Sequence, residues 1–145
     1  MEDLRQLFQL INRRFGLLNE NCCSLGDQKF SLIQSEILYE IDRQRQASMQ
    51  QVAASLGMEI TRFSHQIHTL IRKGLVIKKA SEMDKRVFVL SLTTEGKFVA
   101  TMIDERIKEQ LQQVLNSMND NDKETVLRAL TLLNKSMQIP PSCCT

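Results

Sequence analysis

Hydrophobic residues recur at helical spacing near both ends of the chain. Toward the C-terminus this spacing predicts a long helix over about residues 94–118. A last helix is expected to start at a capping signal, Asn119 to Asp122, and to stop before Pro140. These helices carry more apolar surface than one small domain covers, so a dimer interface is expected. A first helix that ends near residues 19–21 is expected from the stripe formed by Leu4, Leu7, Phe8, Ile11, Phe15 and Leu18.

Two shorter helices are expected in the middle of the chain. Ser48 and Gln51 form a capping box for the first of them, and Gly57 can end it in a left-handed turn. The second is expected to have Thr61 as its N-cap and to stop at Gly74. Two such helices joined by a tight turn indicate a helix-turn-helix. The apolar stripe of the second helix consists of Phe63, Ile67, Leu70 and Ile71.

The opposite face of that second helix is polar. Its hydroxyl, imidazole and guanidinium groups can donate hydrogen bonds to phosphates or base edges, as a recognition helix in the major groove must. His65 and His68 also have the i, i+3 spacing of a helical metal pair, but DNA contact or plain solvation is the favoured interpretation. The candidate DNA-binding residues of this helix are Thr61, Arg62, Ser64, His65, His68, Thr69 and Arg72.

After the second helix the hydrophobic period changes from helical to extended. Residues 75–79 and 86–92 are rich in β-branched and aromatic side chains, and they flank a polar loop at residues 80–85. This pattern predicts a two-stranded hairpin, which would form a wing beside the helix-turn-helix.

The charge of the chain is concentrated in this region. Residues 58–97 contain eight Lys and Arg against four Asp and Glu, a net charge of +4, whereas the remainder of the chain carries −2. This asymmetry locates the DNA-facing surface more clearly than the overall net charge of +2 does. Lys78 and Lys79 are candidate phosphate contacts, with a solvated wing strand as the alternative.

Three segments resemble the MarR family of winged-helix repressors: residues 70–76, 84–86 and 92–96. The resemblance extends across nearly the whole chain, with residues 30–38 as a second helix before the helix-turn-helix. It implies an obligate homodimer that binds a pseudo-palindromic DNA operator. It also implies that the dimerisation region is mostly helical and is built from both ends of the chain.

The same resemblance assigns roles at the tip of the wing. Arg86 would enter the minor groove, and Asp84 would orient it. With Lys85 between them, these residues complete the set of candidate DNA contacts.

The expected fold class is therefore mainly α with a small β-hairpin wing, a winged helix-turn-helix with N- and C-terminal dimerisation helices. We expect one domain over residues 1–145. Within it, the parts are dimerisation helices at about 1–29 and 95–139, the winged helix-turn-helix at about 30–94, and a tail at 140–145.

Length and composition agree with this interpretation. A chain of 145 residues with 42% hydrophobic content is typical of one globular domain. The N-terminus lacks a basic segment followed by an apolar core, and no apolar run approaches the ~18 residues that a membrane span needs. We expect a soluble, cytoplasmic protein. An enzyme is not expected, because the sequence has no Gly-rich phosphate loop, no CxxC and no nucleophile elbow.

All four cysteines stand in two adjacent pairs outside the DNA-reading segment: Cys22 and Cys23 after the first helix, and Cys143 and Cys144 at the end. Buried structural cysteines would be expected within apolar stripes, so these thiols are expected to be accessible. In a reducing cytoplasm, an accessible dithiol fits a metal ligand or a redox sensor better than a permanent disulfide. Exposed thiols without a role are the alternative.

Neighbouring thiolates favour soft ions, with trivalent arsenic first and mercury, cadmium, copper(I) and zinc after it. No single pair supplies three thiolates, so Cys22 and Cys23 would be completed by Cys143 or Cys144 of the same or the other subunit. Oxidation-sensing members of the family carry a reactive cysteine inside the first helix. The position of this pair after that helix favours metal or metalloid capture. No cofactor is required.

Two further hypotheses concern the partner or effector. One is a repressor of the same family whose effector is a small aromatic or drug-like ligand, held in a pocket between the dimerisation helices and the DNA-binding segment. One Tyr and no Trp leave few aromatic side chains for such a pocket, which ranks this hypothesis below the thiol switch. The other is a protein-interaction module, against which the +4 segment argues.

Overall fold

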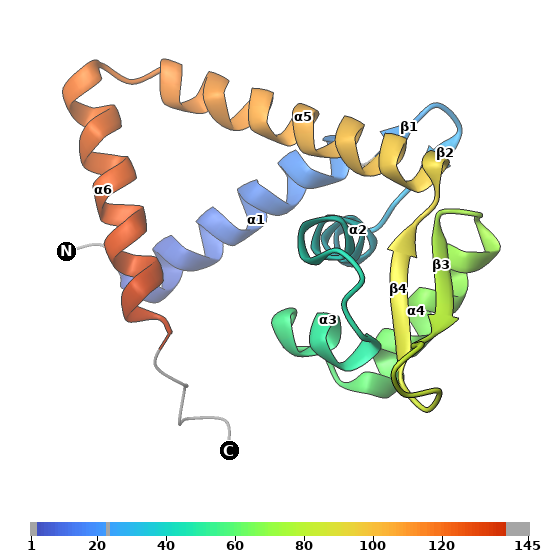
Figure 1. The fold of residues 1–145 in the computed structure, drawn as a ribbon. Coiled ribbons are helices and arrows are strands. Elements are labelled where there is room, and N and C mark those ends of the chain that lie inside the picture. Colours follow the sequence, from blue (N-terminus) through green and yellow to red (C-terminus); the bar gives the residue numbers. More distant parts are fainter. Residues whose placement is uncertain (1–2, 23, 139–145) are drawn as a thin grey trace. The chain divides into compact units, whose positions relative to one another are not determined.

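The computed structural model describes residues 3–22 and 24–138. The described chain comprises two compact units, residues 1–107 and 108–145, and each is considered by itself. Figure 1 labels the elements in chain order: α1 (Leu4–Cys22), β1 (Ser24–Leu25), β2 (Gln28–Lys29), α2 (Leu32–Gln44), α3 (Met49–Ser55), α4 (Ile60–Arg72), β3 (Val76–Ala80), β4 (Phe88–Leu92), α5 (Thr94–Asn116) and α6 (Asp120–Ser136).

The predicted fold class is confirmed: the protein is mainly helical with a small hairpin wing. Strands β3 and β4 pair antiparallel, with Val76 opposite Leu92 and Ala80 opposite Phe88. A single bridge between Ser48 and Val89 extends this sheet on its other side. The bridge ties the start of α3 to the wing.

The capping signals in the sequence set several helix starts. The Ser48 hydroxyl accepts a hydrogen bond from Gln51 N, and the Gln51 side chain accepts one from Ser48 N, at 3.1 and 2.9 Å. Ser31 and Gln34 form an equivalent box at the start of α2, which the sequence analysis did not identify. Helix α2 therefore begins later and runs further than the 30–38 segment that was expected.

The predicted N-cap of α4 was wrong. The cap is Glu59, which has extended backbone angles and makes no side-chain capping bond, and Thr61 lies inside the first turn. The cause is the tight turn after α3, where Gly57 has φ +63° and Met58 N donates to Ala53 O at 2.9 Å. This closure places Glu59, which is extended, directly before the first residue of α4.

One hydrophobic core holds the helix-turn-helix, the wing and the first turns of α5 together. The apolar face of α4 faces this core, as its helical stripe predicts. The largest fully buried side chains of the core are Ile37, Leu38, Val52, Phe63, Ile67, Leu70, Leu75 and Leu90.

The junction between the wing and α5 is closely packed. Thr93 Oγ1 donates to Gly74 O at 2.7 Å and accepts from Gly96 N at 2.9 Å. Gly96 is buried, and a Cβ atom at this position would lie 2.0 Å from Leu75 O. Only glycine therefore allows α5 to start against the end of α4 and the first wing strand.

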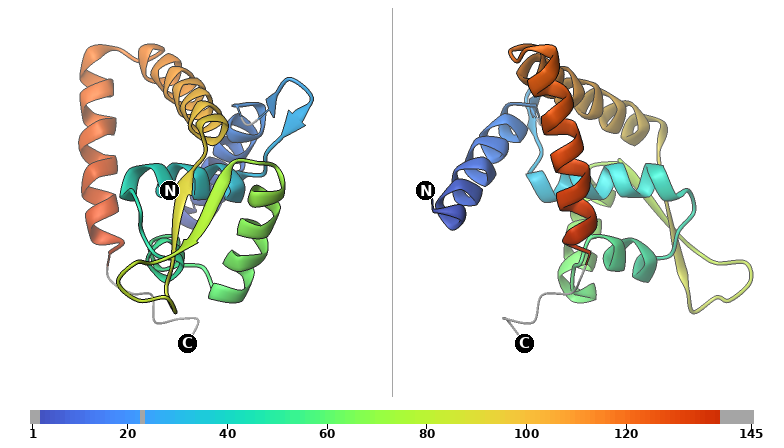
Figure 2. Two further views of the ribbon diagram at one scale, coloured as in Figure 1. Left: turned by 45° about the vertical axis from the view of Figure 1, so that its right-hand side comes forward. Right: turned by 90° about the vertical axis from the view of Figure 1, so that its left-hand side faces the viewer.

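Several boundaries differ from expectation. Helix α1 continues to Cys22, and a two-stranded hairpin, β1–β2, follows it with a turn at Gly26, which has φ +61° (Figure 2). This hairpin was not predicted because its strands have only two residues each and no alternating pattern. Helix α5 ends at Asn116, two residues before the expected end.

The apolar stripes of α1 and α6 remain largely exposed in the single chain. Ile11 is 53% exposed and Leu130 is 55% exposed, and α6 has no buried residue. Asn119 caps α6 as predicted, since its side chain accepts from Asp122 N at 2.8 Å. Within the described residues, none of the helices combines the length and hydropathy of a membrane span.

Candidate nucleic-acid interface

Helix α4 separates an apolar face from a polar one. Phe63, Ile67 and Leu70 are buried in the core. The predicted DNA-binding residues lie on the remaining surface. Thr61, Arg62, His65, His68 and Arg72 are exposed, and Ser64 and Thr69 are half-buried.

The polar face of α4 is partly ordered by its own hydrogen bonds. Thr69 Oγ1 donates to His65 O at 3.3 Å, and Arg72 Nη2 donates to Thr69 Oγ1 at 3.4 Å. Toward the start of the helix, an open depression of about 420 Å³ is lined by Ile60, Thr61, Ser64, His65 and His68. The face thus offers hydrogen-bond donors along several turns, with a hollow toward the start of the helix.

At the wing tip, Asp84 and Arg86 form a local pair. Arg86 N and Nε donate to Asp84 Oδ1 at 3.0 and 3.2 Å, and Arg86 Nη2 donates to Oδ2 at 3.4 Å. The backbone hydrogen bond from Arg86, and then its side chain, hold the pKa of the Asp84 carboxyl below the ordinary value. The Arg86 side chain is 91% exposed, so the pair presents an oriented guanidinium to solvent.

Arg86 does not belong to the second wing strand, although the sequence analysis placed the strand start there. Strand β4 begins at Phe88, and Arg86 lies in the loop, where Val87 N donates to Asp84 O at 3.0 Å. The turn that this bond closes brings the carboxylate under the guanidinium. Lys85, beside them, is exposed.

The two lysines of strand β3 lie in different surroundings. Lys78 is half-buried, and its Nζ lies 4.4 Å from the centroid of the Phe88 ring across the hairpin. Lys79 is exposed. Lys79 is therefore better placed to reach a phosphate, whereas Lys78 is engaged with an aromatic face.

The wing loop and the start of α4 lie at the same end of the unit formed by residues 1–107 (Figure 1 and Figure 2). The fold thus brings the first turn of α4 and the wing tip to one end of the unit, although they are separated in sequence. Donors on a helix and on a flanking hairpin are groups that can contact a DNA major groove and the neighbouring minor groove.

A cation that the sequence analysis did not single out anchors the end of α4. Lys73 Nζ lies 4.8 Å from the centroid of the buried Phe30 ring and donates to Lys29 O at 3.5 Å. On the other side of the same segment, Arg106 Nη1 donates to Ser24 O. The β1–β2 segment is thereby tied to both α4 and α5. No local pattern in the sequence indicates such contacts.

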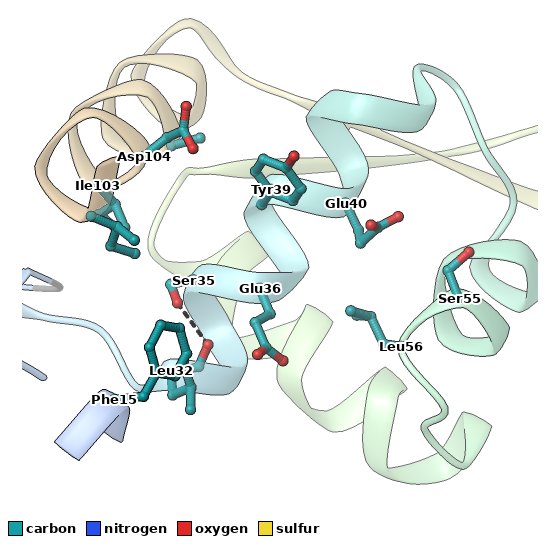
Figure 3. Close-up of a pocket in the computed structure, with 12 residues that line it drawn as sticks. Phe15, Leu32, Ser35, Glu36, Tyr39, Glu40, Ser55, Leu56, Ile103 and Asp104 are labelled. Atoms are coloured by element: carbon teal, nitrogen blue, oxygen red, sulfur yellow. Dashed lines mark hydrogen bonds between the residues drawn. The ribbon is translucent and has the colours of Figure 1, made fainter. Parts of the chain in front are cut away.

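A pocket of about 500 Å³ opens beside α2, within residues 1–107. Figure 3 shows Glu36, Tyr39 and Glu40 projecting from α2, with Ile103 and Asp104 on α5 and Leu56 after α3. Phe15 of α1 contributes to the same lining. The sequence analysis placed Phe15 in the apolar stripe of the first helix but assigned no residue to a pocket, because this lining joins four segments that are far apart along the chain.

The predicted cysteine site falls largely outside the described residues. Cys23, Cys143 and Cys144 lie beyond them, and of Cys22 only the backbone, at the end of α1, is described. Among the residues that the structure does describe, no group of three or more His, Cys, Asp or Glu side chains is arranged to hold a metal ion.

Known proteins support the architecture. Residues 30–96 match the family model of a winged helix DNA-binding domain. No curated protein sequence matches the chain. FabT of Streptococcus pneumoniae in complex with DNA superposes with a TM-score of 0.82 at 19% identity, covering 92% of this chain and 94% of that one.

Two further solved structures have the same fold over nearly the whole chain. Apo MarR from Escherichia coli has a TM-score of 0.77 at 19% identity, over 92% of this chain and 98% of that one. The complex of Staphylococcus aureus MepR with DNA has a TM-score of 0.79 at 19% identity, over 94% and 99%. Residues 30–96 are therefore similar to a winged helix DNA-binding domain, and the chain has a fold of the MarR type.

Proposed function

We propose that this protein is a homodimeric transcription regulator of the MarR type that binds an inverted-repeat DNA operator as a repressor. The observation that carries the proposal is the exposed polar face of α4 beside the oriented Arg86 of the wing, inside the segment that matches a winged helix DNA-binding domain. The similar FabT and MepR structures are complexes with DNA.

In the proposed mode, α4 enters the major groove and the wing tip reaches the adjacent minor groove. Arg62 and His65 would contact base edges, and Arg86 would add a minor-groove contact. In a homodimer, the two copies of α4 would lie about one DNA turn apart, ~34 Å. The operator would then be palindromic, because it must repeat the symmetry of the protein.

The test is DNA selection followed by fluorescence anisotropy on the selected duplex. Arg86→Ala and Arg62→Ala should each weaken binding by about 1–3 kcal/mol, and Arg62→Ala should also relax the base preference at one position of each half-site. Arg13→Ala is a matched control, since Arg13 is an exposed arginine on α1. If Arg86→Ala bound DNA with unchanged affinity and salt dependence, the role of the wing would be wrong.

For the effector, the sequence supports a thiol switch. Adjacent Cys22 and Cys23, completed by Cys143 or Cys144, would capture trivalent arsenic through three thiolates, or another soft ion. Capture would tie the end of α1 to the C-terminal tail. If the tied form has a half-site spacing that no longer fits the operator, DNA affinity falls by the coupling free energy, ~1–3 kcal/mol or ~5- to 150-fold.

The thiol switch is tested by adding arsenite to the protein–DNA complex. The double variant Cys22→Ser with Cys23→Ser should bind DNA normally and should no longer release it when arsenite is added. Truncation after Pro141 should weaken the response. Release of DNA by the double variant at the same arsenite concentration as the native protein would rule the thiol switch out.

The pocket beside α2 favours a second candidate for the effector, a small organic ligand. Its volume of about 500 Å³ lies within the range of small-molecule sites, ~300–1,000 Å³. Its lining joins α1 and α5 to the end of α3, the helix that precedes α4. A ligand that prefers one arrangement of these helices would shift the position of α4, and thereby the DNA affinity.

A further inference from the structure

Ile60 is an exposed apolar side chain at the start of α4. It is the first residue of the helix and is 42% exposed, whereas Phe63, three residues later, is fully buried. Single exposed apolar residues are common on protein surfaces. Ile60, however, lies at the end of α4 that shares one end of the unit with the wing tip (Figure 1 and Figure 2). It is also the end at which recognition helices contact base edges.

The surroundings of Ile60 keep its side chain at the surface. The residue follows the N-cap Glu59, whose carbonyl oxygen accepts from Phe63 N at 2.9 Å. Phe63 and Ile67 are buried in the core and set the rotation of α4 about its axis. Because the helix cannot turn to bury Ile60 without exposing these two side chains, Ile60 is left available to a partner outside the chain.

Ile60 lines the open depression of about 420 Å³ at the start of α4, together with Thr61, Ser64, His65 and His68. By the helical period it shares a face with Ser64 and His68, four and eight residues later. Among the described residues, no Asp or Glu lines this depression, so no carboxylate there would repel a DNA strand. The lining thus combines one branched aliphatic side chain with hydroxyl and imidazole groups.

This combination matches one base in particular. Among the groups that base pairs present in the major groove, the C5-methyl group of thymine is the apolar one, and the others donate or accept hydrogen bonds. An aliphatic side chain gains free energy by covering that methyl group, and it gains nothing comparable from a polar base edge. The hydroxyl and imidazole groups beside Ile60 can meet the polar edges of neighbouring bases.

We propose that Ile60 covers the C5-methyl group of one thymine in each half-site of the operator and thereby selects for that base. The inference rests on the proposed function, because it requires α4 to enter the major groove. It adds an apolar contact to the polar and charged contacts named above.

The contact is tested by replacing the thymines of one half-site of the selected duplex with deoxyuridine, one at a time. Each replacement removes a single methyl group and leaves the base pair and the protein unchanged. Fluorescence anisotropy should show one position at which uracil weakens binding about 4-fold, the factor that corresponds to burial of one methyl group. The salt dependence of binding should not change there, because the methyl group carries no charge. If no uracil replacement weakened binding, the proposal would be overturned.

The assignment to Ile60 is tested with Ile60→Ala, which keeps a good helix former at this position. The variant should bind the thymine duplex and the sensitive uracil duplex with equal affinity. Ile77→Ala is the matched control, because Ile77 is 36% exposed on β3, opposite Ser91 and away from the wing loop. It should retain the full difference between the two duplexes. A difference that survived in Ile60→Ala would assign the methyl contact to another residue and overturn the proposal.

Affinity for the unsubstituted duplex separates this inference from the proposed function. Salt-dependent binding of that duplex without any uracil effect would overturn the thymine contact and leave the regulator proposal in place. Absence of binding to any selected DNA would overturn both.

Discussion

At the residue scale, the wing tip shows how one short-range pair can prepare a binding group. Asp84 is only two residues from Arg86, yet it accepts from both the backbone and the side chain of Arg86. Because the guanidinium is held in one orientation, less side-chain entropy would be lost in the proposed contact with DNA. Because the pair is exposed, it contributes little to the free energy of unfolding, and its main effect is to orient the guanidinium of Arg86.

We predict that the Asp84 carboxyl titrates below its ordinary pKa of 3.8, as measured by NMR across pH 2–6. The charged form accepts the hydrogen bonds of Arg86, so the order of the wing tip is complete above the ordinary pKa and is lost as pH falls through the lowered value. In Arg86→Ala the midpoint should move toward 3.8 and still remain below it, because the backbone N–H at residue 86 is kept. A native midpoint at or above 3.8 would show that the pair does not form in solution.

At the scale of the elements, close contacts to the backbone join the wing, α4 and α5, in addition to the hydrophobic core that they share. Thr93 bridges Gly74 and Gly96, and Thr93 N donates to Leu75 O at 3.0 Å. This junction sets where α5 leaves the wing. A disturbance there would propagate to both neighbours.

We predict that Gly96→Ala lowers the free energy of unfolding by about 3 kcal/mol, at the upper end of the usual cost of overpacking. The reason is that the added Cβ would lie 2.0 Å from the backbone oxygen of Leu75, which cannot move without displacing the wing. Urea denaturation followed by circular dichroism measures the change.

Gly16→Ala is the matched control for that measurement. Gly16 lies within α1, and a Cβ atom at this position would meet nothing within 4 Å. The same substitution should there stabilise the helix by up to about 1 kcal/mol. If both variants changed stability equally, the close approach of Gly96 to Leu75 would not exist in solution.

At the scale of the whole molecule, the exposed apolar stripes of α1 and α6 are the feature that a single chain leaves unexplained. Leu4, Ile11 and Leu130 are all more than half exposed, and none of the α6 side chains is buried. Monomeric proteins rarely expose apolar surface on this scale. In the homodimer that we propose, a second copy of the chain covers these stripes.

We predict that Leu130→Glu converts the dimer into monomers, as measured by sedimentation equilibrium. Burial of an unpaired carboxylate in an apolar interface costs several kcal/mol, so the dimer dissociation constant should rise at least about 100-fold. Arg128→Glu is the control, because Arg128 lies on the opposite side of α6 by the helical period. A dimer that survived Leu130→Glu would place the interface elsewhere.

By itself, the sequence determined the features that depend on neighbours a few residues away. The Ser48–Gln51 capping box, the left-handed turn at Gly57, the stop of α4 before Gly74 and the cap of α6 were all predicted, and the structure confirms them. Each is a bond or a dihedral preference within one turn of chain. The winged helix-turn-helix followed from their order, because hydrophobic periodicity and caps together leave few arrangements open.

Only the tertiary structure decided what depends on distant segments. The start of α4 at Ile60 instead of after Thr61 followed from the closure of α3 at Gly57, and the β1–β2 hairpin is tied by Lys73 and Arg106 from other helices. The pocket beside α2 joins residues from Phe15 to Ile107. Such contacts leave no periodic mark in the sequence, because each side chain is chosen against partners that folding alone brings near.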